Sequence, residues 1–236
     1  PAVAITQVLM EMIEMAFLAK ENIVRAYNSL VNGDMSESKK ISEVEYRIDF
    51  LTNKITGFLI KISSVTKFAG DAKLIGGFHH VANDIERLGD YAVLIANETG
   101  YMKENNIQFL DETKEELNLV YDKIMEMFDL GLDAFKNRRI DNFNRISNLR
   151  KEINSMVTST REEHVMRLNS GMYPVEVSKS IYSVTFSMQR IAAHIENIAF
   201  SVRSTTGSST EALKAIEAEM KKRKNPELYQ ESEQFS

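Results

Sequence analysis

The chain contains no cysteine among its 236 residues. Disulfide bonds, thiolate zinc sites, iron–sulfur clusters and cysteine nucleophiles are therefore excluded. Glycine and proline are also scarce, with 10 and 3 copies, and long stretches contain neither. Because these two residues interrupt helices and make tight turns, their scarcity predicts a few long helices rather than many short strands.

Long apolar runs and an excess of basic residues are missing as well. No stretch approaches the ~20 apolar residues of a membrane span, and no basic start followed by an apolar core marks a signal peptide. The net charge is −5, whereas nucleic-acid binding depends on clustered Lys and Arg that contact phosphates. We therefore expect no nucleic-acid partner.

Apolar residues recur every three or four positions in six segments, which is the pattern of amphipathic helices. Short polar or glycine-containing breaks separate these segments. Ser36 and Asp141 are the predicted N-caps of the second and fifth helices. The predicted helices cover about 5–31, 37–62, 72–101, 111–138, 142–170 and 175–203.

The second half of the chain repeats the first. A shift of 105 residues places Ile41 on Ile146, and a shift of 103 residues places Arg87 on Arg190. We therefore predict an all-α fold of six long helices in two tandem, similar three-helix bundles. The predicted parts are a first repeat, a second repeat and a polar C-terminal tail with a short helix, over 1–104, 105–206 and 207–236.

Two pairs of acids lie at i, i+4 on the flanks of neighbouring predicted helices, Glu45 with Asp49 and Glu86 with Asp90. Each pair has about the same ~120° offset from the apolar stripe of its helix. Like charges at this spacing repel by a few tenths of a kcal/mol, and Arg87 is predicted to point away from Glu86. A metal ion at the acids is therefore one interpretation. A solvated acidic face is the other, because acids are usually exposed.

His79 lies two turns before Glu86 on the same flank. It is either a further metal ligand or a histidine that only hydrogen-bonds. Oxygen ligands suit Mg²⁺ or Mn²⁺, and Fe is compatible where carboxylates bridge several ions, so the identity of the metal stays open. We expect metal in the first half only, because the second half lacks the acids. The corresponding residues there are Arg150, Asn154, Gln189 and Ala193.

The run Glu86-Arg87-Leu88-Gly89-Asp90-Tyr91-Ala92, with Glu45 and Asp49 one helix earlier, resembles the PhoU family of phosphate-homeostasis regulators. The run from Gln189 to Ala199 is similar to the second motif of that family with both acids replaced. The resemblance covers roughly residues 5–204 and includes the duplication. It implies two three-helix bundles whose Glu-x-x-x-Asp pairs bind metal clusters on the outer surface.

The resembled family occurs in two settings. One is a free cytoplasmic regulator of a phosphate ABC transporter and its sensor kinase, and the other is the soluble end of a sodium/phosphate cotransporter. The start at Pro1 without Met, and the pattern of Glu11, Met12 and Met15, look more like the second setting. We therefore expect a cytoplasmic domain at the inner face of the membrane, as part of an integral membrane protein. Its expected partner is a membrane phosphate transporter in the same chain. The free regulator is the alternative, and a homodimer stays open.

We expect a regulator rather than an enzyme, because the sequence shows no nucleophile, glycine-rich phosphate loop or acid–base pair. A carboxylate-bridged metalloenzyme is the alternative, since helix bundles with paired carboxylates also build di-iron oxidases. Such sites use Glu-x-x-His on two helices, and this sequence contains no Glu-x-x-His. A scaffold that binds no metal is the third interpretation.

Overall fold

The computed structural model describes residues 2–66, 69–205, 214, 216 and 218. The rest of the predicted tail lies outside the described residues. Within the described ranges there are six α-helices and one short 3₁₀-helix but no strand, and no helix is long and apolar enough to cross a membrane. The elements are α1 (Ala2–Asn32), α2 (Ser38–Val65), α3 (Ala69–Glu104), α4 (Asp111–Asn137), α5 (Phe143–Asn169), α6 (Val177–Phe200) and η1 (Ser201–Thr205).

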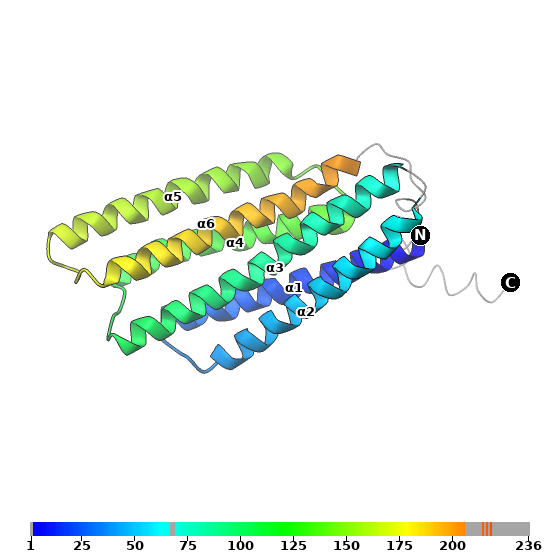
Figure 1. Cartoon of the computed structure of the whole chain (residues 1–236). Coiled ribbons are helices and arrows are strands. Elements are labelled where there is room, and N and C mark those ends of the chain that lie inside the picture. The colour runs from blue at the N-terminus through cyan, green and yellow to red at the C-terminus, as the bar shows by residue number, and fades with distance from the viewer. Residues whose placement is uncertain (1, 67–68, 206–213, 215, 217, 219–236) are drawn as a thin grey trace, which may run out of the picture.

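The six helices form two three-helix bundles that lie side by side along their length (Figure 1). In the first bundle α3 packs against α1 and α2, and in the second α6 packs against α4 and α5. The bundles meet chiefly where α3 contacts α6. The predicted all-α fold of two tandem bundles is therefore confirmed. Because α2 contacts α3, α3 contacts α6 and α6 contacts α5, these four helices follow one another across the molecule.

The apolar stripes of the helices form one continuous core. On α2 and α3 the stripe residues Ile48, Val81 and Ile85 are fully buried, as amphipathic patterning requires. Phe78 of the first bundle meets Phe135 of the second edge to face, with ring centroids 6.2 Å apart. This contact joins the cores of the two bundles.

The first helix of each bundle ends in the same way. Gly33 follows α1 with a φ of 64°, and Arg138 follows α4 with a φ of 55°. A left-handed residue after the last turn is a common helix ending, in which glycine avoids the steric penalty of a Cβ atom. The two positions are related by the same shift of 105 residues (138 − 33) that relates the repeats. The duplication therefore kept this turn even where the residue changed.

The two predicted N-caps are wrong. α2 follows Glu37 and α5 follows Asn142, and neither of these residues makes a side-chain capping bond. The N–H and hydroxyl of Ser36 instead donate to the Asp34 carboxylate, at 2.9 and 2.7 Å. Asp141 accepts a hydrogen bond from Nε of Arg139 at 3.1 Å. Polar groups within each turn therefore satisfy one another before the helix begins.

Candidate metal centre

The two acid pairs are brought together where α2 packs against α3. Ile48 lies between Glu45 and Asp49 in the sequence, and Gly89 precedes Asp90. A Cβ atom at Gly89 would lie only 3.3 Å from Cδ1 of Ile48. The missing side chain of Gly89 thus leaves room for Ile48, which places the acids of α2 beside those of α3.

Three of the predicted ligands form a close group. One carboxylate oxygen from each of Glu45, Asp49 and Asp90 lies within 4.8 Å of the other two, and all three residues are half-buried. Hard cations are coordinated by oxygens at roughly 2.0–2.6 Å, so ligands on opposite sides of one ion are about 4–5 Å apart. The spacing and the chemistry of this donor set therefore fit a divalent cation.

Glu86 belongs to the same electrostatic cluster, although its oxygens are not part of the group of three. Burial raises the pKa of both Glu45 and Glu86, and the charges of Asp49 and Asp90 raise both values further. The Arg87 guanidinium opposes this rise at Glu86. The cluster therefore concentrates negative charge that a bound cation would neutralise.

Arg87 is paired with Asp90, the second acid of α3, rather than with Glu86. Its Nη1 donates to Oδ2 of Asp90 at 2.8 Å, an ion pair across three residues of α3. The helical offset directs Arg87 away from Glu86, but Asp90 at i+3 is within reach of the long side chain. The Arg87 side chain is 58% exposed, so this pair contributes little and leaves most of the negative charge in place.

His79 is not brought to the carboxylate group. It lies on α3 seven residues before Glu86, which is about 10 Å along the helix axis. Burial and the charge of neighbouring His80 lower the pKa of its ring. A neutral ring keeps a free nitrogen lone pair, so a role for His79 as a further ligand stays a prediction.

The equivalent place in the second repeat has a different character. Nη1 of Arg150 and Nε2 of Gln189 both donate to Oδ1 of Asn154, the second bond at 3.3 Å. Ala193 supplies no ligand atom. Arg150, Asn154 and Gln189 therefore lie together, as the acids do in the first repeat. Guanidinium and amide groups take the place of the carboxylates.

A polar contact between the repeats was missed by the sequence reasoning. Oδ1 of Asp84 on α3 accepts from Nδ1 of His194 at 2.7 Å and from the amide of Asn197 at 3.1 Å, both on α6. The largely buried His194 therefore joins α6 to α3 through this contact. Asp84 carries no sequence signal of its own, because only the packing of α3 on α6 identifies its partner.

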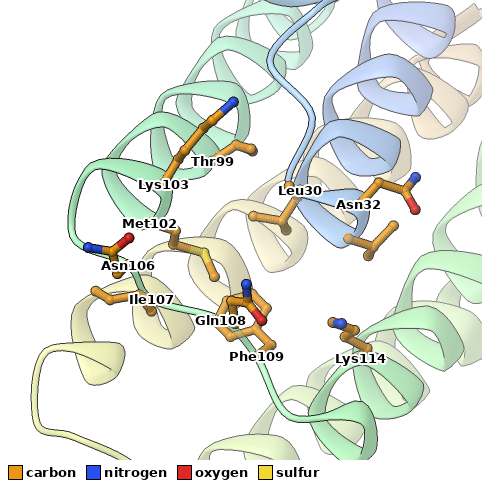
Figure 2. A pocket seen from close by; sticks show the side chains of 12 residues that line it. Leu30, Asn32, Thr99, Met102, Lys103, Asn106, Ile107, Gln108, Phe109 and Lys114 are labelled. Atoms are coloured by element: carbon orange, nitrogen blue, oxygen red, sulfur yellow. The ribbon is translucent and has the colours of Figure 1, made fainter.

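A cavity of about 370 Å³ lies where the two repeats join (Figure 2). The ends of α1 and α3, the link after α3 and Lys114 of α4 surround it. Its apolar lining includes the buried side chains of Leu30, Met102 and Phe109. None of the five predicted metal ligands contributes to it, so it is separate from the candidate centre.

Comparison with known proteins gives relatives that are named as phosphate-specific transport system accessory proteins. The chain is 23% identical over 186 residues to the phosphate-specific transport system accessory protein PhoU homolog 1 of Thermotoga maritima, covering 78% of this chain and 79% of that protein. It is 28% identical over 115 residues to the phosphate-specific transport system accessory protein PhoU homolog of Aquifex aeolicus, covering 45% of this chain and 52% of that protein.

Two solved structures share the fold. The crystal structure of PhoU from Pseudomonas aeruginosa matches with a TM-score of 0.81 and 20% identity, over 88% of this chain and 99% of that one. The phosphate transport system regulatory protein PhoU from Streptococcus pneumoniae matches with a TM-score of 0.78 and 16% identity, over 88% and 97%. The pairing of two three-helix bundles is therefore the arrangement seen in these structures.

The expectation of an integral membrane protein at the inner face of the membrane is wrong. The relatives that the chain matches over most of their length are PhoU homologues rather than cotransporters. The methionine pattern that suggested a cotransporter has a simpler cause, because Met12 and Met15 are both fully buried in the bundle core. Methionine fills such irregular core spaces readily.

The family match includes both halves of the chain. The PhoU domain family matches residues 12–99 and 117–202, which together are well over half of the sequence. These two ranges contain the acids of the first repeat and their replacements in the second. The chain therefore belongs to the PhoU family.

Proposed function

We propose that this protein is a free-standing, non-enzymatic regulator that acts with a phosphate transport system, and that it binds divalent metal on its first repeat. Membership of the PhoU family, with both repeats matched, supports the regulatory role. The matched proteins are named as accessory or regulatory proteins of phosphate transport systems. The partner is therefore a membrane phosphate transporter in a separate chain.

The observation that carries the metal proposal is the close group of Glu45, Asp49 and Asp90. Glu86 is a fourth carboxylate in the same cluster, and the charges of Asp90 and Asp49 raise its pKa. Such ligands suit Mg²⁺ or Mn²⁺, or Fe where several ions share carboxylates. The bound charge would reverse the local negative potential and create a surface suited to an anionic partner.

The metal proposal is tested by elemental analysis of protein purified without chelator. The double variant Asp49→Asn, Asp90→Asn keeps the side-chain shapes but removes two anionic ligands. Loss of an outer-shell partner alone weakens metal affinity roughly 10–100-fold, so the loss of two ligands should weaken it at least that much and lower the metal content of the purified protein. The matched control is Asp129→Asn with Asp133→Asn, another i, i+4 acid pair, on α4.

A scaffold that binds no metal is the second candidate, and the ion pair between Arg87 and Asp90 favours it. In that case both double variants would have the same metal content as the parent protein. The regulatory role is tested separately, by measuring phosphate uptake in cells that lack the gene. Deletion should change how uptake responds to external phosphate. Unchanged uptake at every phosphate level would contradict the regulatory role.

A further inference from the structure

The cavity where the two repeats join has the lining of a small-molecule site (Figure 2). Its volume of about 370 Å³ lies near the lower end of the roughly 300–1,000 Å³ that ligand pockets usually have. Leu30 of α1, Met102 of α3 and Phe109 of the link between α3 and α4 supply apolar surface, and each is at most 6% exposed. The cavity therefore has room and apolar surface for the body of a small organic molecule.

The charged side chains that line the cavity are of one sign. Lys103 of α3 and Lys114 of α4 belong to the lining, and no Asp or Glu of the described residues does. The whole chain, by contrast, has 34 acids and a net charge of −5. The amides of Asn32, Asn106 and Gln108 also line the cavity, and an amide can both donate and accept hydrogen bonds. The lining therefore suits a ligand that carries a negatively charged group.

Neither lysine is firmly held by an acid. Lys114 pairs with Asp111 at 3.5 Å, but the Asp111 side chain is 92% exposed, so this ion pair contributes little. Lys103 has no carboxylate oxygen within 4.0 Å in the described ranges. Hydrogen bonds from Ser36 are the main cause of the lowered pKa of Asp34, and the charge of Lys103 adds to the lowering. Asp34 is thus bonded to Ser36 and, like Asp111, lies outside the lining. Both ammonium groups are therefore available to a ligand from solvent.

Both repeats contribute to the cavity. Leu30 and Lys103 come from helices of the first repeat, and Lys114 comes from the first helix of the second. The link between the repeats contributes residues 106–109, and Figure 2 shows these segments around the same space. A ligand here would contact both repeats at the point where the chain passes from one to the other. Its binding would therefore stabilise the folded junction.

We propose that this cavity binds a small organic anion, with its acid group at Lys103 and Lys114. The apolar body of the ligand lies against Leu30, Met102 and Phe109. The acid group is a carboxylate or a phosphate monoester, because an ammonium group acts as a compact point charge that pairs with either. An inorganic ion would leave the apolar surface uncovered, and a neutral molecule would leave the lysines without a counter-charge. The inference goes beyond the proposed function and does not depend on the metal site.

The test is NMR of the full chain, freed of metal and labelled at the methionine methyl groups. The probes are hydrocinnamate and phenyl phosphate, which carry the two kinds of acid group on a phenyl ring. At least one of them should shift the Met102 signal saturably and leave Met188, a buried residue of the second bundle, unmoved. Met102→Leu identifies the signal. Tighter binding of phenyl phosphate identifies a phosphorylated ligand, and tighter binding of hydrocinnamate identifies a carboxylate.

Two further probes separate the contribution of the charge from that of the apolar body. Hydrocinnamyl alcohol keeps the ring but has no charge, and acetate keeps a carboxylate but has no ring. Each should bind at least about tenfold more weakly than the tighter of the two anionic probes, because each loses one of the two kinds of contact.

Variants locate the binding in the cavity. Lys103→Gln and Lys114→Gln should each weaken binding about tenfold, because each removes a charge-assisted hydrogen bond. Gln108→Trp should abolish binding, because the larger side chain fills the cavity. Gln108 is exposed, so this substitution leaves the core packing as it is.

The matched control is Lys136→Gln, which removes the same charge from an exposed position of α4 outside the lining. This variant should bind both probes as the parent protein does. The proposal is overturned if neither anionic probe shifts the Met102 signal saturably, or if hydrocinnamyl alcohol binds as tightly as the anions. It is also overturned if the variants of Lys103 and Lys114 bind like the parent, or if Lys136→Gln weakens binding as much as they do.

Discussion

At the scale of single residues, the acidic cluster is expected to destabilise the metal-free protein at neutral pH. Burial and the neighbouring acids raise the pKa of Glu45 in the folded state. At pH values between the unfolded and the folded pKa, Glu45 is therefore protonated in the folded protein but ionised in the unfolded chain. The penalty is therefore fully present above the folded pKa, and it disappears as the pH falls below the unfolded pKa. Stability from this group rises as the pH is lowered through that window.

Glu45→Gln should accordingly stabilise the metal-free protein at pH 7, by less than about 1 kcal/mol because the group is only half-buried. The gain should shrink toward zero as the pH falls through the raised pKa of Glu45. Urea unfolding of both proteins between pH 7 and pH 4 measures this. Glu43→Gln, on the same helix but outside the cluster, is the control. A gain that is constant with pH would contradict the assigned cause.

The acids that gather at this site were predictable, but their detailed pairing was not. Helical spacing alone places Glu45 and Asp49 on the flank of α2, and Glu86 and Asp90 on that of α3. It does not fix side-chain rotamers, which decide that Arg87 reaches Asp90 and which oxygens share one small volume. Such details depend on torsions that a periodic pattern leaves open.

At the scale of the helices, small residues set how closely the elements approach. A Cβ atom at Gly131 of α4 would lie 2.8 Å from Cγ2 of Ile195 and 3.5 Å from its carbonyl oxygen on α6. Gly57 of α2 has nothing within 4 Å of the same position. Gly131 therefore permits the close contact of α4 with α6, whereas Gly57 has no neighbour that requires the absence of a side chain.

Gly131→Ala should destabilise the protein by about 1–3 kcal/mol, because the added methyl group overpacks the contact of α4 with α6. Gly57→Ala should stabilise it by roughly 0.5–1 kcal/mol, since alanine favours an exposed helix interior. Thermal and urea unfolding of the two variants give the comparison. The packing argument fails if both substitutions shift stability in the same direction.

Helix number, order and approximate bounds followed from the sequence, because long amphipathic segments with few breaks leave little freedom. The precise first turns did not. Ser36 and Asp141 have the chemistry of caps, but each instead bonds within its own turn. Several polar residues near the start of a helix can serve as its N-cap, and these alternatives differ little in free energy.

At the scale of the whole molecule, the two repeats contact each other chiefly along α3 and α6. The duplication predicts two similar bundles, but no periodic signal predicts which faces they turn toward each other. The same limit applies to the expected membrane setting, which relied on a methionine pattern that core packing explains. The hydrogen bonds of Asp84 with His194 and Asn197 form a polar contact between the two repeats, and this contact can be tested by mutation.

Asp84→Ala should lower the free energy of unfolding by about 1–3 kcal/mol, because it removes the acceptor of two hydrogen bonds and leaves Nδ1 of His194 without a partner. Nε2 of this histidine already has no partner among the described residues. Asn83→Ala, an exposed neighbour on α3, should change stability by less than about 0.5 kcal/mol. Because the two residues interact directly, Asp84→Ala and His194→Ala together should destabilise by less than the sum of the single effects. Strict additivity in this cycle would show that the contact does not couple the repeats.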